Sequence, residues 1–410
     1  MKLRLGEPLT VSLAYTVDNI LPVGRIALDA GRALFGYDES YIASGHRFQP
    51  TWPMPNDVAI VAKDPRTFKG LHGVFADSLP DAWGHEIMRR RTGAQGVQYD
   101  SLTALDRLAM VGQTGVGALV YRPDNSDAEE GDVVLDALAA GAAAILDGSD
   151  TAVVETLARL GGSSGGARPK VFVARNAVGH TVSGTAAVPP GYAPYIVKFR
   201  GGMDVRDIGP LEAAYADMAR AAGIVIAPTT LIRASDGPGY FATERFDRIG
   251  ENGRIHVLSI AAILDLDWSQ PSIDYAALIT IVSRITRDAQ AQEQMFRRMT
   301  FNALARNRDD HTKQHALLQS DNGDWLLAPA YDLTLSPGPN NQHYLAVNGK
   351  GNGITVDDIL AVAREVSIRA PRAKEIVDEV RTTVAQFPMF AAKYGVTRPT
   401  LSAFKQLQKT

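Results

Sequence analysis

Residues 160–173 read Leu-Gly-Gly-Ser-Ser-Gly-Gly-Ala-Arg-Pro-Lys-Val-Phe-Val, a glycine-rich loop that runs directly into an apolar strand. Four glycines around Ser163 and Ser164 leave backbone N–H groups uncovered, and such groups can cradle a phosphate. The usual nucleotide motifs are missing: Arg168-Pro169-Lys170 stands where a Walker A loop has Gly-Lys-Ser/Thr, and no G-x-G-x-x-G pattern occurs in this loop. From the loop alone, a phosphate-binding loop and a flexible linker both stay open.

The chain on either side of this loop divides into three blocks, which we expect to be domains at 1–122, 123–250 and 251–410. The first mixes alternating strands with helices, and a helix is expected through His85–Arg91 with Asp81 as its cap. The polar stretch Pro123–Asp132 marks the first boundary. The middle block is rich in strands, expected at Val171–Val173, Tyr195–Phe199, Thr229–Ile232 and Tyr240–Phe246, with a helix at Pro210–Ala222. Helical periodicity dominates the last block, most clearly at Gln292–Arg306, Val356–Val366 and Ala370–Phe387.

Composition excludes several classes of protein. There are 42 Lys+Arg against 45 Asp+Glu, and such near-neutrality argues against unaided, non-specific binding of nucleic acid. The chain has no cysteine, which excludes disulfide scaffolds, thiolate zinc sites and cysteine nucleophiles. No apolar run approaches the roughly 20 residues of a membrane span. We therefore expect a cytoplasmic, multi-lobed protein with a ligand cleft between lobes.

Lys198 lies in the otherwise apolar strand Ile196-Val197-Lys198-Phe199. A lysine in such a strand usually lies on its solvent face. The alternative is that Lys198 points into a cleft at nucleotide phosphates and is held by an acid such as Glu212 on the following helix.

Polar residues gather in Asn307-Arg308-Asp309-Asp310-His311-Thr312-Lys313-Gln314-His315, where a helical run ends. The His311-x-x-x-His315 spacing would suit a zinc site on a helix, but the glutamate that zinc proteases carry after the first histidine is replaced by Thr312. A better interpretation makes Asp309 a general base or hydroxyl-orienting carboxylate. Asp332, further along the chain, would then bind magnesium, which prefers oxygen ligands. Both aspartates also fit ordinary turn positions.

The order of these parts is that of a protein kinase: a glycine-rich loop, a strand lysine, a helical acid, a catalytic-type aspartate and a metal-type aspartate. The usual kinase signatures are absent, so the sequence indicates a divergent branch.

Taken together, the motifs resemble those of the HipA toxin kinases of bacterial HipBA toxin–antitoxin systems. Besides the Ser163–Lys170 loop, they are Phe75-Ala76-Asp77-Ser78-Leu79-Pro80-Asp81-Ala82-Trp83-Gly84, Thr243-Glu244-Arg245-Phe246-Asp247-Arg248, Asn307–Lys313 and Ala328-Pro329-Ala330-Tyr331-Asp332-Leu333. The resemblance implies an α+β, bilobal protein-kinase-like fold with an added N-terminal α/β subdomain and an all-helical C-terminal lobe.

The resemblance also implies roles for individual residues. Asp309 would be catalytic, Gln314 and Asp332 would hold Mg²⁺, and Ser163 would be autophosphorylated, adding negative charge that ejects the loop from the cleft. The residues expected to bind ATP are Gly165, Gly166, Ala167, Arg168, Pro169, Lys170, Lys198, Glu244, Arg245, Phe246 and His311. One position departs from the family: Gln314 replaces an asparagine, which lengthens a metal-ligand side chain by one methylene.

Two functions follow from the resemblance. The first is an ATP- and Mg²⁺-dependent serine/threonine protein kinase that arrests growth by phosphorylating a protein such as an aminoacyl-tRNA synthetase. Its partner would be a helix-turn-helix antitoxin of the HipB type, through which it would contact DNA. The alternative, kept open by Gln314, is a catalytically weak kinase-like scaffold that acts as co-repressor with the antitoxin.

Overall fold

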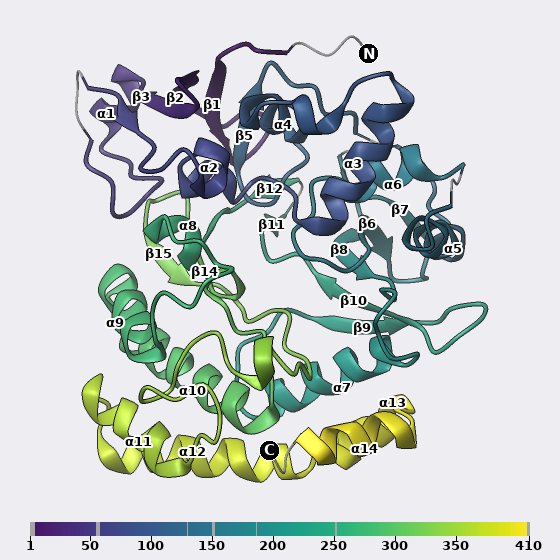
Figure 1. Ribbon diagram of the computed structural model, residues 1–410, viewed down its shortest axis with the longest axis vertical. Helices are drawn as coiled ribbons and strands as arrows, with labels where there is room; N and C mark the ends of the chain where they lie inside the picture. The colour runs from purple at the N-terminus through teal and green to yellow at the C-terminus, as the bar shows by residue number, and fades with distance from the viewer. Residues whose placement is uncertain are drawn as a thin grey trace.

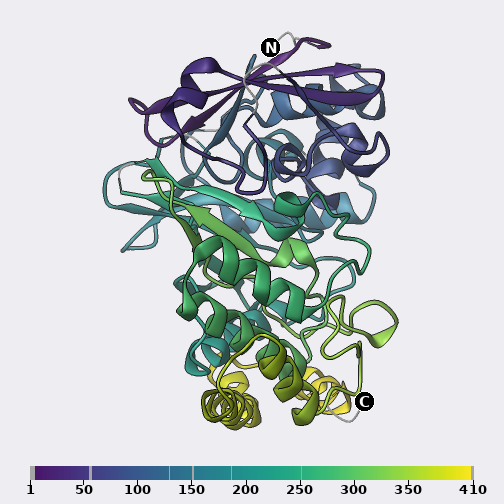
Figure 2. The ribbon, with the colours of Figure 1, turned by 90° about the vertical axis from the view of Figure 1, so that its left-hand side faces the viewer.

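The computed structural model describes residues 5–54, 58–128, 130–149, 152–185, 187–250 and 252–407, apart from the side chains of residues 403, 405 and 407. Three tiers follow one another down the long axis, as Figure 1 shows. The purple and blue N-terminal region lies at the top, teal and green strands cross the middle, and yellow helices form the base. The same order is visible from the side (Figure 2).

The N-terminal tier is built on an antiparallel sheet, the N-terminal sheet, with the helices around it. Its strands are β1 (Leu9–Ala14), β2 (Ile20–Asp29), β3 (Arg32–Tyr37), β4 (Ile60–Val61) and β5 (Leu119–Arg122), arranged β4-β3-β2-β1-β5. The helices are α1 (Glu39–Ser44), α2 (Gly73–Ala76), α3 (Ala82–Ala94) and α4 (Ala104–Val111). Leu9, Val11 and Leu13 of β1 alternate inward, as the apolar pattern at the start of the chain predicts.

The second tier holds the middle sheet, an antiparallel sheet in the order β7-β6-β8-β10-β9. Its strands are β6 (Lys170–Asn176), β7 (Thr181–Ser183), β8 (Tyr192–Lys198), β9 (Thr229–Ile232) and β10 (Tyr240–Glu244). Helices α5 (Leu135–Leu146), α6 (Val154–Gly161) and α7 (Ile208–Ala221) belong to the same tier. These elements confirm the strands and the helix predicted for this part of the chain, to within a few residues at each end.

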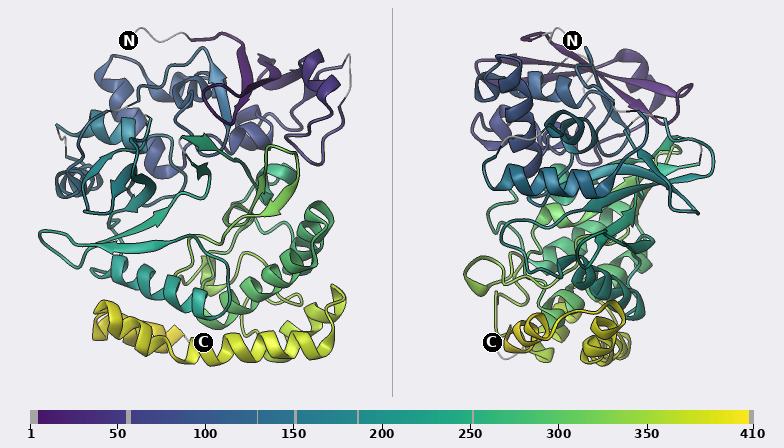
Figure 3. Two further views of the ribbon diagram at one scale, coloured as in Figure 1. Left: turned by 180° about the vertical axis from the view of Figure 1, so that it is seen from behind. Right: turned by 90° about the vertical axis from the view of Figure 1, so that its right-hand side faces the viewer.

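The last part of the chain is mainly helical but not entirely so. Its helices are α8 (Ile260–Leu264), α9 (Tyr275–Thr286), α10 (Ala289–Ala305), α11 (Val356–Glu365), α12 (Ala370–Ala385), α13 (Phe387–Tyr394) and α14 (Arg398–Leu407). Seen from behind, α11 to α14 form the base of the molecule (Figure 3).

The expectation of an all-helical C-terminal lobe needs correction. A small sheet of β13 (His256–Ser259), β14 (Ala316–Gln319) and β15 (Trp325–Leu327) precedes and interrupts the helices. Strands of three or four residues are too short for their periodicity to stand out in a sequence. A hairpin of β11 (Arg248–Ile249) and β12 (Gly253–Arg254) leads into this sheet.

The helix α3 crosses from the first tier to the second. Its Trp83, Ile87 and Met88 are buried in the apolar cluster that also contains Leu160 of α6 and Val171 of β6. The N-terminal sheet shares a different, larger core with the helices of the C-terminal part. The N-terminal region is therefore packed against both other parts of the molecule.

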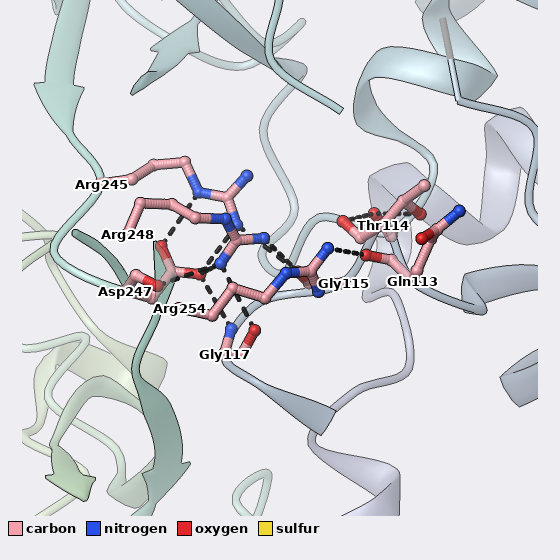
Figure 4. Close-up of polar contacts among 9 residues, drawn as sticks. Gln113, Thr114, Gly115, Gly117, Arg245, Asp247, Arg248 and Arg254 are labelled. Atoms are coloured by element: carbon pink, nitrogen blue, oxygen red, sulfur yellow. Dashed lines mark hydrogen bonds and ion pairs between the residues drawn. The ribbon is translucent and has the colours of Figure 1, made fainter. Parts of the chain in front are cut away.

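A buried network of arginines ties the hairpin β11–β12 to a loop of the N-terminal region (Figure 4). The Asp247 carboxylate accepts hydrogen bonds from Arg245 (Nε, 2.9 Å), Arg248 and the Gly117 N–H (2.8 Å). The guanidinium groups in turn donate to backbone carbonyls, Arg248 to Gly115 (3.0 Å) and Arg254 to Gln113 (2.7 Å). Two arginines thus share one buried carboxylate, and a third, Arg254, binds the backbone of the same loop.

A cavity of about 630 Å³ adjoins this network, lined by residues of β1, β5 and the β11–β12 hairpin, by the start of β8 and by described residues between β7 and β8. It lies between the N-terminal and middle sheets and contains none of the predicted site residues. Within the described part of the chain, no helix has the length and apolar character to cross a bilayer.

Candidate active site

Lys198 ends β8, and its side chain is nearly buried rather than on a solvent face. Its ammonium group contacts two carboxylates, Glu212 of α7 at 3.3 Å and Asp332 in a closer ion pair. The structure therefore contradicts the solvent-face interpretation of this lysine and confirms its predicted contact with Glu212. A strand lysine paired with a helical glutamate is also the arrangement that positions phosphates in kinases.

Glu212 receives a second cation from the glycine-rich loop. The Arg168 guanidinium pairs with Glu212, and its Nε lies 3.1 Å from the Asp204 carboxylate. Because the Glu212 side chain is almost fully buried, its charge is balanced by these two cations rather than by water. The loop, the strand and the helix are thereby joined at one carboxylate.

Asp332 lies beside this cluster, with its backbone in the left-handed region (φ +55°). Burial alone would raise the pKa of its carboxyl, but the ammonium groups of Lys198 and Lys170 hold that pKa well below its usual range. The Lys170 side chain is buried and donates to the Gly165 carbonyl. Burial lowers the pKa of Lys170 to about 8, with Lys198 as a further cation nearby.

The two neighbouring aspartates of the 307–315 segment face opposite ways. The Asp309 side chain is 50% exposed and lies 3.7 Å from His311 Nε2. Partial burial and the nearby Asp332 carboxylate raise the pKa of Asp309, which brings a carboxylate closer to the range of a general base. Asp310 is fully buried and accepts hydrogen bonds from Tyr275 Oη (2.7 Å), His343 Nδ1 (2.8 Å) and the Tyr344 N–H (2.9 Å).

The zinc interpretation of His311 and His315 finds no support in the geometry. The intervening residues Thr312–Gln314 form a 3₁₀ turn, and both histidines have extended backbones, so the two rings do not share the face of an α-helix. His315 is buried, and burial lowers its pKa to about 3. His311 packs against Trp268 and Tyr344, with ring centroids at 4.7 and 5.3 Å. Among the described residues, no group of three or more histidine and carboxylate side chains forms a metal site.

Gln314 ends the 3₁₀ turn, half-buried, and its backbone N–H donates to the His311 carbonyl (2.9 Å). Its side-chain amide and the Asp332 carboxylate are oxygen donors of the type that magnesium prefers. Asp332 already lies against cations, so a divalent ion there would compete with Lys198 for the same oxygen. The donor types at these two residues fit magnesium bound jointly by protein and phosphate oxygens.

The glycine-rich loop is ordered and packed, unlike a flexible linker. The Gly166 N–H donates to Asp81 Oδ2 at 2.6 Å, and the Pro169 carbonyl accepts from the Phe199 N–H at 2.8 Å. Ala167 is exposed. The Ser163 hydroxyl is buried and donates to the Thr114 carbonyl (3.0 Å), within the loop that the arginine network holds.

The three residues predicted on the adenine side, Glu244 to Phe246, lie at the end of β10 and just after it. Their side chains do not all lie in the same environment. Glu244 and Phe246 are partly buried, and the Phe246 ring lies 5.8 Å from that of Tyr331, next to Asp332. The Arg245 side chain does not join the cluster around Lys198. Its guanidinium is bound to Asp247 and lies over the Phe172 ring at 4.2 Å. Its charge is therefore paired within the arginine network of Figure 4.

The sequence did not reveal the functional position of Asp81. It stands at the N-cap position of α3, as predicted, but its carboxylate does not bond to that helix. It binds Gly166 of the loop and Lys313 of the 307–315 segment instead. The sequence signal was the Leu79-Pro80-Asp81-Ala82-Trp83-Gly84 motif itself, since an aspartate before a helix fits a cap and a tertiary contact equally well.

Comparison with known proteins agrees with this architecture. A model of the HipA N-terminal domain matches residues 17–122, and a model of the HipA-like C-terminal domain matches residues 162–387. A search among curated proteins gave no match.

Two solved structures are similar to different extents. HipA from the Shewanella oneidensis MR-1 complex of HipA, HipB and operator DNA superposes with a TM-score of 0.70 at 15% identity, over 98% of this chain and 95% of that chain. The proinflammatory kinase CtkA of Helicobacter pylori covers 52% of this chain and 92% of its own at 13% identity, but a TM-score of 0.33 is too low to support an argument. The first of these matches confirms the α+β, kinase-like fold. Because the C-terminal model alone spans more than half of the sequence, and the N-terminal model precedes it in order, the chain belongs to the HipA family.

Proposed function

We propose that this protein is an ATP- and Mg²⁺-dependent serine/threonine protein kinase of the HipA toxin type. The observation that carries the proposal is the position of Lys198, between Glu212 and Asp332 and beside the glycine-rich loop. Phosphate transfer depends mainly on positioning and on neutralising charge, and this cluster brings Arg168, Lys170 and Lys198 together for that purpose. In this proposal residues 1–122, 123–250 and 251–410 are the N-terminal subdomain, the loop-bearing lobe and the C-terminal lobe.

The chain's own residues would divide the work as follows. Lys198 and Lys170 would neutralise the phosphates, and the loop from Gly165 to Lys170 would cover them. Asp309 would accept the proton of the substrate hydroxyl, and its half-exposed side chain leaves room for an incoming protein. The Phe246 ring, which packs on Tyr331, would border the adenine.

Asp332 and Gln314 would supply protein oxygen atoms for the metal. Bound Mg²⁺ would neutralise phosphate charge and orient the transferred group. With Asp332 engaged in this way, Lys198 would keep its second partner, Glu212 at 3.3 Å, and would stay available to the phosphates.

Further parts of the proposal come from the family. Ser163 would be the site of autophosphorylation, and its buried bond to Thr114 means that the loop must open first. A helix-turn-helix antitoxin of the HipB type would be the partner, as the HipA–HipB–DNA complex of the structural relative suggests, with DNA reached through it. The protein target would be an aminoacyl-tRNA synthetase.

The proposal is tested by incubating the purified chain with Mg²⁺ and ATP, followed by intact-mass and peptide mass spectrometry. We expect one added phosphate, on Ser163, and none in the Asp309→Asn variant. Absence of both transfer and nucleotide binding, the latter measured by calorimetry, would contradict the kinase proposal and favour the scaffold alternative. Nucleotide binding without transfer would contradict autophosphorylation and leave a kinase that acts on another protein.

Nucleotide affinity should also depend on pH through Lys170. Its pKa is lowered to about 8, so the ammonium charge is present below pH 8 and is lost as the pH rises through that value. We expect the Kd for Mg-ATP to rise above pH 8, by at most about tenfold per pH unit because a single proton is involved. Calorimetry between pH 7 and 9.5 measures this change. The Lys170→Arg variant keeps its charge throughout, and an equal rise in that variant would rule out Lys170 as the cause.

A further inference from the structure

Asp81 brings a carboxylate from the N-terminal region to the glycine-rich loop and the catalytic segment at once. Its Oδ2 accepts from the Gly166 N–H and its Oδ1 from Lys313 Nζ, both at 2.6 Å. The side chain is 17% exposed, so these bonds are mostly shielded from water. The lysine holds the pKa of Asp81 below its usual range, against the effect of burial, and the group is therefore an anion at neutral pH.

The backbone around Asp81 is shaped for this approach. The Asp81 N–H lies 3.4 Å from the Ser164 carbonyl. One turn into α3, a Cβ on Gly84 would lie 2.8 Å from the Gly162 carbonyl and 2.4 Å from Pro80 Cβ. Only glycine at position 84 allows the start of the helix to lie this close to the loop.

The two donors that Asp81 occupies are of the kind that bind phosphate. One is a backbone N–H in a glycine-rich loop, and the other is a lysine four residues after Asp309. Asp81, which holds both donors, belongs to the same electrostatic cluster as the proposed nucleotide site, since Lys170 interacts with Asp81, Asp332, Lys198 and Glu212 together. A phosphate that enters this cluster finds the Gly166 N–H and the Lys313 ammonium already bound to the Asp81 carboxylate.

We propose that Asp81 is an internal competitor of the nucleotide: its carboxylate occupies donors that the ATP phosphates need, so the N-terminal region limits the affinity for ATP. The inference rests on the proposed function, which places Gly166 over the phosphates, and it adds Lys313 as a further phosphate donor. On binding, Lys313 and the Gly166 N–H exchange the carboxylate for phosphate oxygens, and no covalent step is involved. Neutralising Asp81 removes both the competitor and its repulsion of ATP.

The test compares Mg-ATP binding by calorimetry in wild type and three variants. We expect Asp81→Asn, which keeps the shape of the side chain, to bind about tenfold more tightly, since one adjacent negative charge is removed. Lys313→Met should bind about tenfold more weakly, because one phosphate donor is lost. Glu86→Gln, the same charge change on an exposed face of α3 beside Arg89 and Arg90, should stay within about twofold.

Competition predicts that the affinity for Mg-ATP rises in Asp81→Asn and falls in Lys313→Met. A purely structural role of the pair does not predict this difference. If the Asp81–Lys313 pair only held the loop in place, both variants would weaken binding, and unchanged or weaker binding by Asp81→Asn overturns the proposal. Hydrogen exchange of the 160–172 segment gives a second measurement, with faster exchange expected in Asp81→Asn because the Gly166 N–H is released. If wild type itself fails to bind Mg-ATP, it is the kinase proposal that fails.

Discussion

The Asp309→Asn variant is expected to fold as wild type does and to lose phosphate transfer by about 10²- to 10⁴-fold, the usual contribution of a general base. The Asp309 side chain is half exposed, and its close polar neighbour is His311 at 3.7 Å, so little folding energy depends on it. Asparagine keeps the shape but cannot accept the proton of a substrate hydroxyl. Transfer is measured by the appearance of phosphate on Ser163, and folding by the melting temperature.

The matched control is the next residue. Asp310→Asn places an amide among three donors, Tyr275 Oη, His343 Nδ1 and the Tyr344 N–H, in a fully buried site. We expect a loss of about 3 kcal/mol in the free energy of unfolding, on the scale of breaking a buried charged contact. Well below its melting temperature, this variant should keep far more transfer than Asp309→Asn. If the two variants behave alike, the division between a catalytic and a structural aspartate is wrong.

The largest loss of stability is expected from Asp247→Ala. This carboxylate is the shared partner of Arg245 and Arg248, and all three side chains are largely buried. Its removal leaves uncompensated guanidinium groups in the interior and frees the Gly117 N–H. Breaking a buried ion pair from one side costs about 3–5 kcal/mol, a large part of the stability of an ordinary domain.

Urea unfolding of this variant can be compared with Asp378→Ala, which removes an exposed partner of Arg381 on α12. That change should cost less than about 1 kcal/mol. A loss of similar size in both variants would mean that the arginine network does not depend on Asp247.

The sequence predicted those parts of the fold and site that depend on local pattern. The strands β6, β8, β9 and β10 of the middle sheet, with α7 and α10, were recognisable because their apolar residues recur at strand or helix spacing. The short strand β7 was not predicted. The pairing of Lys198 with Glu212 was predictable because the helix follows that strand directly in the chain. The roles of Gln314 and Ser163 came from family resemblance, whereas those of Asp309 and Asp332 were also proposed from the residue types and their order. All four stay predictions until transfer is measured.

What the sequence could not provide was the partner of a side chain whose position suits two roles. Asp81 has the position of a helix cap, and only the packing of α3 against the loop shows that its carboxylate is used there. Arg245 lies in the adenine-side motif, yet its guanidinium forms an ion pair with Asp247, two residues later. The strands β13–β15 were missed because each is shorter than one clear period of alternation.

The arginine network and the burial of α3 have a consequence for how such proteins evolve. The HipA-like C-terminal region begins at residue 162, but Trp83 and Ile87 cover its sheet, and the Gln113–Gly117 loop accepts the bonds of its arginines. A gene that lost its first third would encode a sheet without its cover and arginines without the backbone acceptors at Gln113 and Gly115. Recombination between relatives would succeed only where the new N-terminal region offers the same carbonyls. The two regions are therefore expected to be inherited together, and their family trees should branch in the same order.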